Sequence, residues 1–149
     1  MLIGKTFPRG GKEIPHRKKA TEGKQIVTLA PPQLVVIPLQ QHIGARCEPL
    51  VSVGDHVKMG QMIGDSSQFV SAPVHASVSG KVVAIEEREL LNGNKCLAVV
   101  IENDGKDEKY ALPTRPVEKM SADAIREVVR SAGIVGMGGA GFPTHIKLK

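Results

Sequence analysis

The fold is decided by the stretch VGDHVKMGQMIG at residues 53–64, which is followed by the related stretch VSGKVVAI at residues 78–85. Gly54-Asp55 and Met59-Gly60 stand where tight turns need a residue that accepts a positive φ or bonds to its own backbone. Between these turns apolar and polar residues alternate, as they do in strands with one buried face. The stretch therefore predicts short β-strands joined by tight turns.

The spacing of these turns resembles the barrel-sandwich hybrid of biotinyl and lipoyl carrier domains, over roughly residues 48–86. Apolar, β-branched runs at residues 34–39 and 96–102 and the hairpin signal Asn92-Gly93 add further strands around it. We therefore expect a mainly β fold of the barrel-sandwich hybrid type, with an extended N-terminal arm and a short C-terminal helix plus glycine-rich loop.

The resemblance does not include the residue that carriers modify. Carrier domains present a lysine on an exposed hairpin between the two halves of the fold, and the corresponding residues 65–69 read DSSQF. Neither Ser67 nor Gln68 has the amine that an amide with biotin or lipoate requires. The sequence thus favours a structural or docking module. A carrier function would need Lys58 or Lys81, which stand beside turn glycines and off this hairpin.

The excess positive charge lies in the first residues. The formal net charge is +5, and residues 1–24 hold seven basic side chains against two acidic ones, so the rest of the chain is balanced. A basic arm of this kind suits an acidic partner subunit or an anionic membrane surface, or is a solvated tail. Nucleic acid is disfavoured, because Phe7 is the arm's one aromatic residue and the chain has no Trp. The candidate contacts in the arm are Arg9, Lys12, Arg17, Lys18 and Lys19.

Cysteine and histidine spacing predicts no metal site. Cys47 and Cys96 are far apart and stand in apolar, strand-like surroundings, which is typical of buried free thiols. The five histidines show no metal-binding spacing. No run approaches the ~20 apolar residues of a membrane-spanning helix, and the first residues do not resemble a signal peptide. These features predict a cytoplasmic protein.

The sequence suggests four regions: a basic extended arm at residues 1–25, the barrel-sandwich domain at 26–103, a linker at 104–119 and a further region at 120–149. The last region should open with a helix of about eleven residues. Ser121 is its expected N-cap and Gly133 its stop. Its apolar stripe is formed by Ile125, Val128, Val129 and Ala132.

A glycine-rich loop follows this helix and reads GMGGAGFPTHIK at residues 136–147. The loop matches the dinucleotide-binding fingerprint G-x-G-x-x-G poorly, because that fingerprint requires a strand before it and an acidic residue ~20 positions after it, and neither is found here. The longer string GMGGAGFPT resembles the flavin-binding loop of the flavoprotein subunit of respiratory complex I. In that family the backbone N–H groups of the loop hold the FMN phosphate. The residues implied here are Gly136, Gly138, Gly139, Ala140, Gly141, Phe142, Pro143 and Thr144, with Lys147 as a further phosphate contact.

The order of all these segments is similar to the RnfC subunit of the Rnf electron transport complexes. The resemblance implies a peripheral subunit on the inner face of the cell membrane, within a complex that exchanges electrons between ferredoxin and NAD and pumps ions. It also implies FMN, NADH and iron–sulfur clusters in the parent subunit, of which this chain would be an N-terminal portion, inert alone. The alternative is a lysine-free adaptor that docks proteins in another redox or cobalamin-processing system.

Overall fold

The computed structural model describes residues 17–114 and 116–149, which belong to two units, Met1–Ala30 and Pro31–Lys149. Arg9 and Lys12 of the predicted arm lie outside the described residues. In the first unit the described residues form one 3-10 helix, η1 (Lys18–Ala20), and none of them is buried. The apolar run at residues 26–29 forms no strand there, and its aliphatic side chains are 85–97% exposed.

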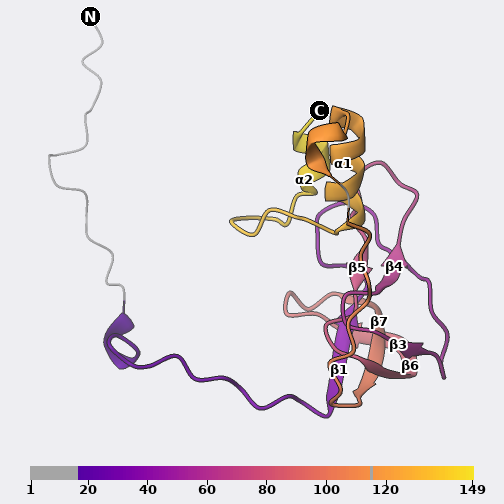
Figure 1. Ribbon diagram of the computed structural model, residues 1–149. Coiled ribbons are helices and arrows are strands. Elements are labelled where there is room, and N and C mark those ends of the chain that lie inside the picture. The colour runs from indigo at the N-terminus through magenta and orange to yellow at the C-terminus, as the bar shows by residue number, and fades with distance from the viewer. Residues whose placement is uncertain (1–16, 115) are drawn as a thin grey trace, which may run out of the picture. The chain divides into compact units, whose positions relative to one another are not determined.

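The second unit is built around a four-stranded antiparallel sheet (Figure 1). Its strands are β1 (Leu34–Pro38), β7 (Lys95–Asn103), β6 (Gly80–Glu89) and β3 (His56–Val57), in that order across the sheet. The β6–β7 pair is the longest ladder, from Gly80↔Asn103 to Glu89↔Lys95. The turn between these strands is closed by the Leu90 N–H, which donates to the Asn94 carbonyl at 2.7 Å.

A second sheet of three short antiparallel strands completes the β domain. It contains β2 (Glu48–Pro49), β4 (Met62–Asp65) and β5 (Val74–His75) in the order β2-β4-β5. The predicted turns join the two sheets: Gly54 and Gly60 both have positive φ, as their places in the sequence require. The turn prediction is therefore confirmed.

Both sheets contribute to a single core, which confirms the mainly β, barrel-sandwich prediction. At its start β6 alternates, so that Val82 is buried while its neighbours Lys81 and Val83 are exposed, whereas the central strand β7 buries the consecutive residues 98–101. Cys47 and Cys96 are buried and unpaired, as expected for free thiols. The buried aliphatic members of the core are Ile37, Leu39, Val57, Ile63, Val74, Ala76, Val82, Val99 and Ile101.

The C-terminal region contains η2 (Val117–Lys119), α1 (Ala122–Ser131) and α2 (Thr144–Lys147). Ser121 is the N-cap of α1, because its hydroxyl accepts a hydrogen bond from the Ala124 N–H at 3.2 Å, and Gly133 follows the helix with φ +66°. The expected apolar stripe is only partly covered, since Ile125 and Val128 are 37% and 38% exposed. No helix in the described part of the chain has the length and apolar character needed to cross a bilayer.

A polar cluster fastens residues 104–110 to the β domain. The Asp104 carboxylate accepts hydrogen bonds from the Ser79 hydroxyl at 2.7 Å and the Lys106 N–H at 2.9 Å, and it lies 2.9 Å from His56 Nε2. The Lys58 ammonium pairs with Glu108 at 2.6 Å. The hydrogen bonds from the Lys106 N–H and from Ser79 lower the pKa of Asp104 to about 2. The first residues of the segment that the sequence predicts as a linker, 104–119, are thus attached to the β domain beside β3.

Replacement of Gly80 by alanine should destabilise the β domain. An added Cβ would lie 1.9 Å from the Glu102 carbonyl oxygen in the neighbouring strand, which cannot move without disturbing the β6–β7 ladder. We expect Gly80→Ala to lower the free energy of unfolding in urea by about 2 kcal/mol or more. Gly138→Ala, at a glycine with open space around it, should change it by less than about 0.5 kcal/mol. Equal losses in both variants would contradict the assigned β6–β7 register.

Because of the Asp104 cluster, the free energy of unfolding should fall at acidic pH. Because the folded pKa of Asp104 lies near 2, below the ordinary value of 3.8, its contribution is complete above about pH 4 and is lost as the pH falls toward 2. We expect the urea midpoint of Asp104→Asn to fall less between pH 5 and 2 than that of the unaltered chain, in equilibrium unfolding followed by circular dichroism. Parallel pH profiles would show that the carboxylate has no such role.

Candidate functional site

The turn that follows β4 occupies the place of the lysine-bearing hairpin of carrier domains. Residues 65–72 contain no lysine, and the turn is closed by the buried Ser71, whose hydroxyl lies 3.1 Å from the Ser66 carbonyl oxygen and 2.6 Å from that of Gln68. Phe69 is 61% exposed at the tip. Of the two lysines considered as alternative acceptors, Lys58 is paired with Glu108, and Lys81 is exposed on β6. The turn itself therefore carries no amine.

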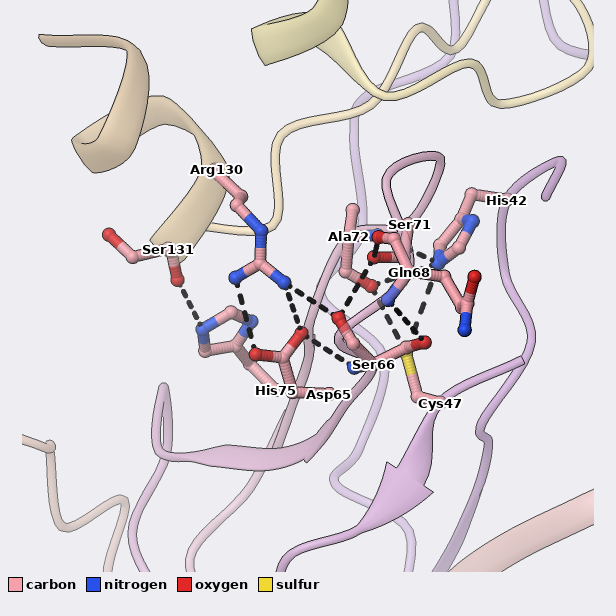
Figure 2. A network of polar contacts seen from close by, with 10 residues as sticks. All are labelled: His42, Cys47, Asp65, Ser66, Gln68, Ser71, Ala72, His75, Arg130 and Ser131. Atoms are coloured by element: carbon pink, nitrogen blue, oxygen red, sulfur yellow. Dashed lines mark hydrogen bonds and ion pairs between the residues drawn. The ribbon is translucent and has the colours of Figure 1, made fainter. Parts of the chain in front are cut away.

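A buried histidine and a buried cysteine hold the far end of this turn (Figure 2). The Ala72 N–H can only donate, so His42 Nε2 at 3.0 Å accepts from it, and the Nδ1–H then donates to the Ile43 carbonyl at 3.0 Å. The Cys47 thiol donates to the Ala72 carbonyl at 3.2 Å. Burial, followed by the nearby Asp65 charge, raises the pKa of Cys47 to about 11. Cys47 is thus a protonated structural thiol and a poor nucleophile.

Helix α1 is attached to the same turn through an arginine. Arg130 donates from one nitrogen to Asp65 Oδ1 at 2.9 Å and to the Ser66 carbonyl at 2.8 Å, and from the other to Asp65 Oδ2 at 3.2 Å. Both side chains are about three-quarters buried, at 23% and 26% exposure. One residue later, the Ser131 carbonyl lies 3.0 Å from His75 Nε2 of β5 (Figure 2). The last turn of α1 is therefore fixed to β4 and β5.

The glycine-rich loop begins directly after this helix and has a closed base. Val135 and Pro143 form an antiparallel bridge. The Gly136 N–H donates to the Phe142 carbonyl at 2.9 Å, and the Thr144 N–H donates to the Ile134 carbonyl at 3.0 Å. Pro143 is buried, which anchors the returning side of the loop. The base of the loop is thus a short β-like pair.

The glycines of the loop fall into two groups. Gly141 has φ +67°, and a Cβ there would lie 3.1 Å from the Gln41 carbonyl oxygen and 3.2 Å from His42 Cα, so glycine lets this side of the loop approach the β domain. The Ala140 carbonyl oxygen also accepts from the Ile43 N–H at 3.2 Å. Gly138 and Gly139, in contrast, have open space around their Cβ positions. Within residues 17–114 and 116–149, neither of these two amides donates to another backbone carbonyl.

The remaining predicted site residues line the same loop. The Lys147 ammonium lies 5.6 Å from the centre of the Phe142 ring and 3.5 Å from a Cβ placed on Gly136. His145 Nδ1 is buried without a hydrogen-bond partner, and burial lowers the pKa of this ring. The residues that the sequence grouped at 136–147 are thus close in space, with the tip of the loop open. The structure describes no metal-binding cluster of histidine, cysteine or carboxylate residues in the ranges 17–114 and 116–149.

The sequence did not identify the contacts that join this loop to the β domain. Asp65 and Arg130 are 65 residues apart and belong to no common sequence pattern. Gly133 was identified as a helix stop, but a Cβ there would also lie 2.5 Å from the Pro73 carbonyl oxygen and 3.0 Å from His75 Nδ1. Arg130 lies on the side of the helix away from the stripe of Ile125, Val128, Val129 and Ala132, so the apolar pattern gave no signal for its contact.

A family model and several known proteins match this chain in sequence. A family model described as "RnfC Barrel sandwich hybrid domain" matches residues 5–106. The C subunit of the Na(+)-translocating ferredoxin:NAD(+) oxidoreductase complex of Acetobacterium woodii is 49% identical over 142 residues, which are 94% of this chain and 32% of that protein. The proton-translocating counterpart of Clostridium ljungdahlii is also 49% identical, over 94% of this chain and 31% of that protein.

A more distant relative has the same pattern of coverage. The C subunit of the ion-translocating oxidoreductase complex of Vibrio cholerae is 37% identical over 98% of this chain but only 19% of its own length. The chain therefore spans a third or less of the curated relatives it matches. Because the family model covers most of the chain and its strands form the expected core, the chain belongs to the RnfC barrel sandwich hybrid domain family.

Proposed function

We propose that this chain acts in a peripheral subunit of a membrane-bound, ion-translocating complex that transfers electrons between ferredoxin and NAD. The names of its relatives support this role, since they are C subunits of ferredoxin:NAD(+) oxidoreductase complexes. The observation that carries the proposal is the open-tipped glycine loop fixed to a carrier-like domain that lacks the carrier lysine. The β domain then serves as a scaffold and docking surface.

The loop is proposed as the first part of an FMN site. Packing on the β domain accounts for glycine at positions 133 and 141, but nothing in the described chain fills the space at Gly138 and Gly139. A bound phosphate group that approaches these backbone amides closely would account for both glycines. The Lys147 ammonium, beside the loop, would add positive charge for that phosphate. FMN, when bound, would supply the step between hydride transfer and one-electron transfer.

The proposed role divides the chain nearly as the sequence suggested. Residues 1–25 would act as the arm, 104–119 as the connection and 120–149 as the start of the flavin and NADH domain. The barrel-sandwich domain, predicted at 26–103, would begin at residue 31, because residues 26–29 form no strand and are exposed. With two cysteines, both buried, the chain has too few thiolates for a four-cysteine iron–sulfur cluster, so such clusters would belong to other parts of the subunit. We accordingly propose that these 149 residues alone do not oxidise NADH.

The partners would be other subunits of the complex, at the inner face of the cell membrane. Arg17, Lys18 and Lys19 are exposed in the described part of the arm, and acidic loops or anionic lipid would attract them. The aliphatic side chains of Ile26, Val27 and Leu29, 85–97% exposed, are available to the same partner. A nucleic-acid partner is not proposed, since the arm has no series of aromatic residues on which bases could stack.

Lys147 offers a direct test of the FMN site. In the full-length subunit we expect Lys147→Ala to weaken FMN binding about tenfold, because a charge-assisted phosphate contact is lost. The matched control is Lys149→Ala, since Lys149 also lies over a phenylalanine ring, that of Phe69, at 4.3 Å. The dissociation constant would be measured by quenching of flavin fluorescence. Equal FMN affinities of the two variants would remove Lys147 from the site.

The basic arm offers a second test. We expect deletion of residues 1–24 from the full-length subunit to reduce its retention on membranes that contain the other subunits, most clearly at low salt. The difference should disappear as salt rises, because the Debye length falls from ~10 Å at 0.1 M to ~3 Å at 1 M. Sedimentation with washed membranes across a salt series would measure retention. Superimposable curves for both forms would leave the arm as a solvated tail.

A further inference from the structure

The turn that carries a lysine in carrier domains is occupied here by the last turn of α1. A modified lysine must be free to move between sites, whereas Asp65 and Ser66 at this turn receive three hydrogen bonds from a single guanidinium. A forked arginine–carboxylate contact fixes orientation as well as distance. The partial burial of both side chains limits screening by solvent. The contact is therefore suited to holding two elements in one relative position.

In the sequence, Arg130 stands close to the start of the glycine loop. Only five residues separate Arg130 from Gly136, and within them the Ser131 carbonyl is held by His75 and Gly133 touches β5. The outgoing side of the loop is thus fixed by contacts of α1 with the β domain. The returning side is fixed separately, by Gly141 against Gln41 and His42.

The tip of the loop receives no comparable support. Met137 is 95% exposed, and Gly138 and Gly139 have open space around them. The position of the tip amides relative to the β domain therefore depends on the contacts at the two sides of the base. Of these contacts, the one made by Arg130 is the only ion pair in the described ranges between the C-terminal helices and the β domain.

We propose that Arg130, through Asp65 and Ser66, is a positioning residue for the glycine loop and sets the amides of Gly138 and Gly139 in place for their ligand. This proposal rests on the proposed function for the identity of that ligand, FMN. The turn after β4 is thus a fixed anchor for the loop, and the β domain supports ligand binding through its contact with Arg130.

Hydrogen exchange in the 149-residue chain tests the anchoring. We expect Arg130→Lys and Asp65→Asn each to speed exchange of the hydrogen-bonded amides of Ile134, Gly136 and Thr144 at the base of the loop about tenfold, or about 1.4 kcal/mol, while β6 and β7 stay protected. The double variant should be no worse than Arg130→Lys alone, because that substitution already breaks the contact with Asp65. Arg88→Lys, which alters an exposed ion pair with Glu86 on β6, is the matched control and should leave the loop unchanged.

The anchoring role is overturned if the loop exchanges at its original rate in both single variants, if their effects add in the double variant, or if β6 and β7 lose protection equally. FMN titration of the full-length subunit then separates the two proposals. We expect Arg130→Lys to raise the FMN dissociation constant about as much as it speeds exchange, with an unchanged unfolding midpoint. If Arg130→Lys speeds exchange but neither Arg130→Lys nor Lys147→Ala changes FMN affinity, the anchoring role of Arg130 stands and FMN binding at the loop is refuted. If Arg130→Lys leaves exchange unchanged while Lys147→Ala weakens FMN binding, FMN binding at the loop stands and the anchoring role of Arg130 is refuted.

Discussion

The antiparallel pairing of β6 with β7 is the constraint on which the rest of the structure depends. It is the longest ladder in the described chain, and it carries β1 on one side and β3 on the other. Its inward residues, among them Val82, Val99 and Ile101, form the centre of the core that the second sheet covers. The end of the ladder at Asn103 also places Asp104 beside Ser79, which directs the outgoing chain along β3.

The second sheet converts this core into a support for the C-terminal region. Strand β4 delivers Asp65 to its end and β5 delivers His75, and both side chains contact the last turn of α1. The buried His42 and Cys47 hold Ala72 at the end of the turn between these strands. A turn held on both sides in this way is suited to anchoring and unsuited to a swinging arm, which agrees with the missing lysine.

Local patterns in the sequence predicted the local features well. Positive φ at Gly54 and Gly60, the cap at Ser121 and the stop at Gly133 follow from what a few neighbouring residues require. Contacts between distant residues, such as Asp65 with Arg130, leave no such pattern and were not foreseen. The glycine loop shows both cases: the sequence indicated a glycine-rich loop after α1, but it could not show that Gly141 approaches the β domain while Gly138 and Gly139 remain open.

The central claim, that a carrier-like domain holds a cofactor loop in position, is tested most directly by hydrogen exchange of the full-length subunit with and without FMN. We predict that FMN slows exchange at residues 136–141 and leaves the turn at residues 65–72, which is already held by Arg130, at its original rate. FMN-dependent protection that appears at other sites, with none at residues 136–141, would contradict this claim.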